Sequence, residues 1–244
     1  MKVVAIIQAR TGSSRLPNKV LLDLAGKPML ARVVERAQRA TAVDEIVIAT
    51  TEQSADDVIA EMCKANGWLC FRGAENDVLD RYYRASVARS ADIVVRITSD
   101  DPLIDPQLID LHVEHMRARW QHVDFVTNMA RQTFPFGLAV EAMPMDTLAR
   151  CHRLSTSAFL REHVTTLVYE RPDLFLIEHV LNDTDLSGLR WTVDTIEDFR
   201  FVLSVYEAFG HDRFSWRDAL AATRETVAAC GTSVAGHVRQ PECG

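Results

Sequence analysis

The residues best suited to chemistry lie in a short segment near the N-terminus. Residues 9–19 read Ala-Arg-Thr-Gly-Ser-Ser-Arg-Leu-Pro-Asn-Lys and carry three cations, Arg10, Arg15 and Lys19. Glycine admits close approach of the backbone, and hydroxyls and free amides suit phosphate oxygens. Arginine offers a planar fork for phosphate, and lysine a movable point charge. The segment therefore predicts a phosphate-binding loop, against the alternative of a solvated basic connection between a strand and a helix.

Two better-known phosphate motifs are absent from this segment. Asn18 stands where a Walker A loop has glycine before its lysine, and the remaining spacing does not match either. A Gly-x-Gly-x-x-Gly pattern is also missing, so a dinucleotide-binding fold has no support.

Two carboxylate positions could hold a metal ion. Asp100 and Asp101 follow an apolar run and precede Pro102, and Asp194 follows the apolar residues 191–193. A carboxylate fixed at a strand end suits Mg²⁺, which prefers oxygen ligands and substrate phosphates. The alternatives are structural, because aspartate is common in turns and as a helix N-cap.

These candidates need a scaffold, and the first hundred residues indicate one. Apolar runs predict strands at 3–8, 45–50, 69–71 and 92–97, and helical periodicity predicts helices at 29–40, 54–65 and 78–90, the second opened by a capping box at Ser54 and Asp57. Such alternation predicts an α/β fold with a mainly parallel central sheet and helices on both faces. Ligands bind at the carboxyl ends of such strands, so the loops after these strands should hold the site.

The second half of the chain is less regular. It predicts helices at 106–116 (capped by Asp105), 155–170 and 195–209, a last helix opened by Ser215 and Asp218, and strands at 125–127, 138–142 and 174–180. No repeat or linker interrupts the chain, so we expect a single domain over 1–230. Within it, the part at about 125–185 is the more irregular. The segment 231–244 lacks periodicity and is expected to be flexible.

Composition excludes several classes of protein. The 244 residues are 48% hydrophobic and 25% charged, which is typical of a globular protein and not of a disordered or fibrous one. The net charge of -7 argues against a nucleic-acid partner. No apolar run reaches the roughly 18 residues of a membrane span, so no membrane association is expected. Five scattered cysteines without Cys-x-x-Cys spacing predict reduced thiols, no zinc site and a cytoplasmic location.

Residues 8–21 and 26–30 resemble the signature of the cytidylyltransferase family, which includes the enzymes that activate 3-deoxy-manno-octulosonate and acylneuraminate. The resemblance is nearest to the SpsF-type branch of spore-coat polysaccharide proteins. It extends over about residues 1–210 through further ordered stretches at 72–83, 96–106, 161–165 and 190–194.

The resemblance implies a Rossmann-like three-layer fold of the nucleotide-diphospho-sugar transferase type. It also implies Mg²⁺-dependent transfer of CMP from CTP to a sugar acid, a phosphorylated sugar or a related small anionic metabolite, with release of pyrophosphate, in surface polysaccharide or glycan biosynthesis. Arg10, Arg15 and Lys19 would then be the catalytic cations. The implied metal ligands are Asp100 and Asp194. The implied nucleotide-binding residues are Gln8, Ala9, Arg10, Thr11, Gly12, Ser13, Arg15, Lys19, Arg72, Asp77, Arg81 and Asp100.

Some of these assignments have equal alternatives. Asp77 and Arg81 could be charges at a helix start instead, and the Gln8 amide could read a cytosine edge or bond to the backbone. The implied acceptor-binding residues are Asn128, Glu141, Arg161, Glu162 and His163. A structural role is the alternative for His163.

One departure from the family pattern falls in this acceptor region. Ala139 stands where the family commonly has aspartate, which should alter the group that the acceptor pocket holds. The resemblance implies CTP and a small-molecule acceptor as partners. It also implies that the irregular part at about 125–185 binds the acceptor and mediates the formation of a homodimer. Rival functions are nucleotidyl transfer with another base, glycosyl transfer from a nucleotide sugar, and noncatalytic nucleotide-sugar binding.

Overall fold

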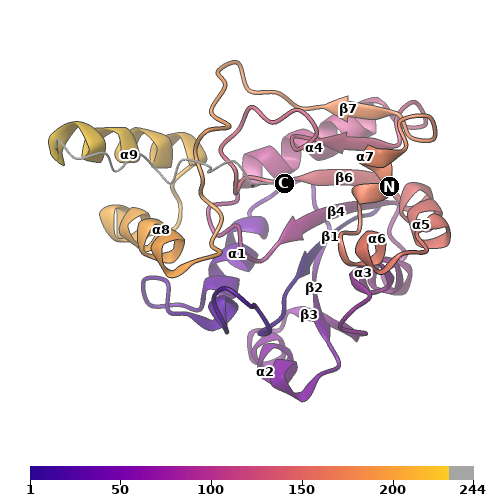
Figure 1. The fold of residues 1–244 in the computed structure, drawn as a ribbon, viewed down its shortest axis with the longest axis horizontal. Helices are drawn as coiled ribbons and strands as arrows, with labels where there is room; N and C mark the ends of the chain where they lie inside the picture. Colours follow the sequence, from indigo (N-terminus) through magenta and orange to yellow (C-terminus); the bar gives the residue numbers. More distant parts are fainter. Residues whose placement is uncertain (231–244) are drawn as a thin grey trace.

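The computed structural model describes residues 1–230, with side chains to residue 223. The expectation of a flexible tail at 231–244 lies outside these residues. Strands from both halves of the described chain form one sheet, shown in Figure 1 with helices on either side.

The centre of the sheet is apolar on both faces. Strand β1 (Val3–Gln8) pairs in parallel with β2 (Glu45–Thr51) and β4 (Ile93–Thr98). Its odd-numbered residues Val3, Ala5 and Ile7 belong to one buried cluster, and its even-numbered residues Val4 and Ile6 belong to the other. A strand covered on both faces reads as a continuous apolar run, which is why residues 3–7 show no alternation.

The strand order is β3-β2-β1-β4-β6-β5-β7. The remaining strands are β3 (Leu69–Gly73), β5 (Phe125–Thr127), β6 (Glu141–Pro144) and β7 (Ile177–His179). All pairs are parallel except those of β6, which runs antiparallel to β4 and β5. The predicted mainly parallel α/β fold is confirmed.

Helices cover the two faces separately (Figure 1). One cluster takes residues from α1 (Met29–Ala37), α2 (Asp57–Asn66), α4 (Pro106–Ala118), α8 (Ile196–Phe209) and α9 (Trp216–Cys230). The other takes residues from α3 (Val78–Ala88), α5 (Met145–Leu154) and α7 (Thr166–Glu170). Short elements complete the fold: α6 (Ala158–Glu162) and the 3₁₀ turns η1 (Lys19–Leu21) and η2 (Ser54–Asp56). None of the described helices is long and apolar enough to cross a membrane.

Helix caps follow the sequence with one exception. Asp105 caps α4 through the amide of Gln107, and Thr195 and Asp198 form a capping box at α8. The predicted capping box at Ser54 and Asp57 is wrong. Residues 54–56 form a 3₁₀ turn instead, because the carboxylate of Asp56 is held by the loop after β1.

Two predictions for the second half are corrected, and one helix there was missed. The helix expected at 155–170 is divided into α6 and α7 by residues 163–165, where Val164 adopts a φ of 52°. This left-handed backbone conformation is strained for a β-branched residue such as valine, so the sequence gives no local signal for it. The helical pattern of apolar residues continues through 163–165 and therefore did not indicate that the helix is interrupted. Helix α5 was not predicted. The strand expected at 138–142 begins only at Glu141, because the Val140 amide bonds to the side chain of Asn128.

Candidate active site

A two-part cleft opens at the carboxyl ends of β1 and β4. The first compartment, of about 310 Å³, is lined by Gln8, Ala9, Arg10, Ser13, Ser14, Arg15, Lys19, Val20, Val78, Arg81, Arg96, Ser99, Asp100, Glu162, His163 and Asp194. The second compartment, of about 650 Å³, shares six of these and adds residues from the segments 98–101, 129–141, 165–169 and 192. The shared residues are Gln8, Arg15, Arg96, Asp100, His163 and Asp194.

The loop after β1 is anchored by a buried carboxylate. The amide and hydroxyl of Thr11 donate to Asp56 Oδ1 at 2.7 and 2.6 Å, and Thr51 also donates to Asp56. Burial alone would raise the pKa of Asp56, but these hydrogen bonds hold it below its usual value. Asp56 is therefore a charged anchor for the loop. Nothing local in the sequence predicted this role, because its partner lies 45 residues away.

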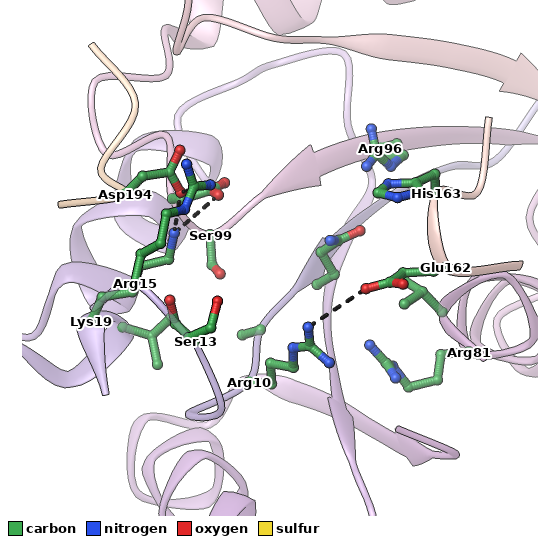
Figure 2. Close-up of a pocket in the computed structure, with 16 residues that line it drawn as sticks. Arg10, Ser13, Arg15, Lys19, Arg81, Arg96, Ser99, Glu162, His163 and Asp194 are labelled. Carbon is green, nitrogen blue, oxygen red and sulfur yellow. Dashed lines mark hydrogen bonds and ion pairs between the residues drawn. The ribbon is translucent and has the colours of Figure 1, made fainter. Parts of the chain in front are cut away.

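Lys19 joins the two predicted metal ligands. Its Nζ lies 3.2 Å from Asp100 Oδ2, 3.0 Å from Asp194 Oδ1 and 2.7 Å from the Val193 carbonyl oxygen. Asp194 also pairs with Arg15 at 3.0 Å and with Arg190 at 2.5 Å. Burial would raise the pKa of Asp194, but these cations lower it below its usual range. Figure 2 shows Arg15, Lys19 and Asp194 grouped on one wall of the first compartment.

Backbone contacts explain how two distant aspartates meet. The Val193 amide donates to the Asp100 carbonyl at 2.8 Å, so the segment before Asp194 lies against the turn after β4. Gly137 permits a third segment to join them. Its φ is 116°, and a Cβ there would lie 2.4 Å from the Thr192 amide nitrogen. Only glycine fits such an approach.

The donor set at this wall fits Mg²⁺. Mg²⁺ is bound through one or two carboxylates together with substrate phosphates and waters. Asp100 and Asp194 both line the cleft and both reach one ammonium group. Over residues 1–223, no group of three or more His, Cys, Asp and Glu side chains could hold a metal ion alone. Asp101 is buried beside them, and burial followed by the charge of Asp100 raises its pKa to about 7.

The other cations of the first compartment are placed differently. Arg10 is 38% exposed and makes long contacts to Glu75 at 3.9 Å and Glu162 at 3.7 Å. Arg81 is buried and donates to the Ala74 and Glu75 carbonyls, and burial lowers its pKa. Arg10, Glu162 and Arg81 lie across the compartment from Lys19 (Figure 2).

Several predicted binding residues lie outside both compartments. Arg72 donates to the Thr51 and Gln53 carbonyls and pairs with Asp57 at 2.7 Å. Asp77 caps α3 and pairs with Arg161 at 2.6 Å, and neither side chain lines a compartment. Thr11 and Gly12 shape the loop without lining the cleft, and Asn128 bonds to the Leu138 and Val140 backbone. Gln8, Ala9, Ser13, Glu141, Glu162 and His163 do line the cleft.

The second compartment contains a buried polar network. Glu141 accepts hydrogen bonds from Arg96 Nη1 at 2.7 Å, from Thr165 Oγ1 at 3.1 Å and from the hydroxyl of Tyr169. Burial would lower the pKa of Arg96, but Glu141 raises it, so the guanidinium stays charged. Ala139 lines the same compartment. Sequence reasoning missed Arg96, Thr165, Tyr169 and Arg190 as parts of the site, although an arginine in an apolar strand was a usable clue for Arg96.

Comparison with known proteins gives consistent matches. Residues 4–213 match the family model described as cytidylyltransferase. An uncharacterized protein of Methanocaldococcus jannaschii is 40% identical over 211 residues, which cover 86% of this chain and 85% of that protein. The spore coat polysaccharide biosynthesis protein SpsF of Bacillus subtilis is 29% identical over 215 residues, which cover 85% and 88%. The structure of a cytidylyltransferase from Leptospira borgpetersenii is similar with a TM-score of 0.91 at 32% identity, over 100% of both chains.

Proposed function

This chain belongs to the cytidylyltransferase family, and from that premise we propose that it transfers CMP from CTP to a small anionic acceptor, with Mg²⁺ and with release of pyrophosphate. The pathway would be the assembly of a surface polysaccharide or glycan, as the similarity to SpsF suggests. The observation that carries the proposal is the cluster of Lys19, Asp100 and Asp194 beside the loop cations at one end of the cleft.

The loop cations would bind the triphosphate of CTP. Arg10 and Arg15 are partly exposed, and their present partners are carboxylates at 3.0 Å or more. The two Arg10 pairs are exposed on both sides, and such pairs are worth about 0–1 kcal/mol, so phosphate oxygens can replace them at little cost. Arg15 pairs with the largely buried Asp194, but its own side chain is 64% exposed and lines the same compartment. Lys19, held between two carboxylates, would stabilise the negative charge that develops on the leaving pyrophosphate.

Asp100 and Asp194 would hold Mg²⁺. The bound ion would neutralise phosphate charge and lower the pKa of the acceptor hydroxyl. The chain's own residues position the reactants, since in-line transfer at phosphorus needs alignment and charge stabilisation and no covalent enzyme intermediate.

The second compartment would receive the acceptor. It adjoins the first compartment at six shared residues, so an acceptor there would lie next to the nucleotide. In-line transfer then requires its hydroxyl to attack the α-phosphate from the side opposite pyrophosphate. Ala139 in this wall means that the chain lacks a carboxylate common in the family, and the acceptor should differ accordingly.

The first experiment is thermal unfolding with CTP, UTP, GTP and ATP, each with and without Mg²⁺. A ligand that binds only the native state raises the melting temperature by mass action. We expect the largest Mg²⁺-dependent rise with CTP, followed by pyrophosphate release once an acceptor is added. No rise with any triphosphate, together with a rise for a nucleotide sugar, would favour glycosyl transfer instead.

We also propose a homodimer formed through the part at 125–185. Its surface carries exposed apolar side chains, namely Leu154, Phe159, Leu174, Leu176 and Leu181. Strand β7 (Ile177–His179) lies last in the strand order, and the unpaired backbone groups of an edge strand can pair with another chain. Light scattering should give twice the chain mass of 27.4 kDa, and a value equal to one chain would contradict the dimer.

A further inference from the structure

Arg96 is the buried arginine at the junction of the two compartments. Among the described residues, Arg15 and Arg96 are the arginines that line both compartments. The Arg15 side chain is 64% exposed and pairs with Asp194, whereas that of Arg96 is 17% exposed. Arg96 is therefore built into the wall, close to His163 in Figure 2.

The sheet fixes the direction of this guanidinium. Arg96 of β4 and Glu141 of β6 are register partners in the antiparallel pair, and their side chains form the 2.7 Å contact. Thr165 and Tyr169 donate to the same carboxylate. Both oxygens of Glu141 are therefore occupied by protein donors. Glu141 acts on Arg96 and has little capacity left to bind a substrate hydroxyl.

The Nε of Arg96 is left with an unused hydrogen bond. This atom is buried and has no hydrogen-bond partner among the described residues, and neither has the buried Oε1 of Gln8 in the same wall. A buried donor without an acceptor costs about 1–3 kcal/mol, and such groups in native proteins call for an explanation. A ligand atom that accepts a hydrogen bond from Arg96 would explain why this donor has no partner within the protein.

We propose that Arg96 binds an anionic oxygen of the acceptor, a carboxylate or a phosphate, and that Glu141 is the positioning residue that orients it. This inference rests on the proposed function and names the side chain that recognises the anionic group of the acceptor. The triphosphate already has Arg10, Arg15 and Lys19 in the first compartment. Arg96 adds a guanidinium group where the second compartment meets the first. An anion bound by the edge of this guanidinium that does not contact Glu141 would lie in the second compartment, next to the nucleotide.

The test uses variants that preserve the charge balance of the wall. Arg96→Met alone leaves Glu141 buried without its cation, which is strongly destabilising. The double variant Arg96→Met/Glu141→Gln removes both charges at similar volume, and Arg96→Lys keeps the charge but loses the fork. Tyr169→Phe removes one donor to Glu141 and keeps Arg96, so it reports the positioning role.

The measurement is calorimetric binding to the full chain, saturated with Mg²⁺ and a nonhydrolysable CTP analogue. The probes are two sugar acids (3-deoxy-manno-octulosonate and N-acetylneuraminate), two phosphate esters (glucose 1-phosphate and glycerol 3-phosphate) and the neutral compounds glucose and glycerol. Binding of the acids or of the esters identifies the anion as carboxylate or phosphate. Probes that bind are then assayed for pyrophosphate release.

We expect at least one anionic probe to bind the wild-type chain and the neutral compounds not to bind. In the double variant the affinity for that probe should fall by about 10- to 100-fold, the loss expected for a charge-assisted hydrogen bond. Affinity for the CTP analogue should not change. Arg96→Lys should recover part of the loss, and Tyr169→Phe should raise the acceptor KM with little change in kcat.

Four results would overturn the inference. These are neutral probes that bind as well as anionic ones, anion binding unchanged in the double variant, an equal loss of CTP-analogue binding, or no anionic probe bound by a wild-type chain that binds the analogue. Failure of the analogue itself to bind would instead overturn the proposed function, and the inference with it.

Discussion

The two compartments of the cleft hold their charges in opposite ways. In the first, Arg10 and Arg15 lie on a loop, are 38% and 64% exposed, and contact carboxylates at 3.0–3.9 Å. In the second, Arg96 and Glu141 are register partners of two strands, and their side chains are 17% and 4% exposed. The exposed Arg10 pairs of the first compartment can be exchanged for phosphates at little cost, while the Arg96–Glu141 pair of the second is already ordered. In the proposed function, the binding of a large, flexible triphosphate and the selection of a small acceptor would therefore rest on different kinds of structure.

Lys19 is the exception within the first compartment, and its loss should have the largest effect. Its side chain is 10% exposed and bonds to both candidate metal ligands. Lys19→Met leaves Asp100 and Asp194 without the ammonium group that joins them and removes the charge proposed to stabilise the leaving pyrophosphate. We expect kcat/KM for pyrophosphate release to fall by about 100- to 1,000-fold, the usual loss of one preorganised electrostatic contact.

The matched control is Lys27→Met, which removes an exposed lysine paired with Glu35. It should leave kcat/KM unchanged. If Lys19→Met lost less than about tenfold, or about 1.4 kcal/mol, the contrast between an ordered Lys19 and the loosely paired loop arginines would be wrong.

The next prediction concerns the anchor of the loop. Asp56→Ala removes the acceptor of the Thr11 amide and hydroxyl and of the Thr51 hydroxyl. The unfolding free energy should fall by about 2–4 kcal/mol, since these are buried hydrogen bonds to a charge. The KM for CTP should rise while that for the acceptor stays constant. Urea denaturation and steady-state kinetics measure the two effects.

Asp57→Ala provides the control at the adjacent position, because Asp57 is exposed and pairs only at the surface with Arg72. An equal effect of both variants on the CTP KM would mean that the loop is not anchored through Asp56. A change in the acceptor KM would mean that the two compartments are not independently supported.

The smallest expected effect lies beneath the second compartment, where α4 packs against β5 and β6. His112 of α4 is fully buried, donates from Nδ1 to the Leu108 carbonyl, and burial lowers its pKa to about 4. The unfolded chain takes up this proton near pH 6.5, but the folded chain does not. Stability from His112 is therefore present above about pH 6.5 and is lost as the pH falls toward 4, by roughly 1 kcal/mol per pH unit.

Urea denaturation between pH 4 and 7.5 measures this slope. The buried Asp101 carboxyl, whose pKa is raised to about 7, gives a slope of opposite sign over the same range, so the contribution of His112 is the difference in slope between wild type and His112→Leu. His122→Gln at an exposed position should leave the slope as in wild type. An unchanged slope in His112→Leu would place the pH dependence elsewhere in the protein.

The contrast between the compartments also explains what sequence could predict. The loop after β1 is contiguous, so the types and spacing of Arg10, Arg15 and Lys19 were visible without a structure. The apolar runs of β1, β2 and β4 likewise predicted the sheet and the edge at which the cleft opens.

The second compartment is assembled from distant parts, so its contacts were not predictable. Arg96 and Glu141 are 45 residues apart and meet only because β6 runs antiparallel to β4. Thr165 and Tyr169 reach Glu141 after the strained turn at Val164, which the helical pattern over 155–170 concealed. Local patterns report burial and periodicity, and neither determines which strands become neighbours.

The close approach at Gly137 has a consequence for protein engineering. A new acceptor specificity would most simply be sought by exchanging the loop around residues 130–139 with that of a relative. Such an exchange must retain glycine at 137, because any side chain there would push against the Trp191–Thr192 backbone and displace the segment that leads to Asp194. A graft that ignores this residue would alter the Lys19–Asp194 wall of the first compartment while aiming at the proposed acceptor compartment, and its loss of activity would be misread as a failure of specificity.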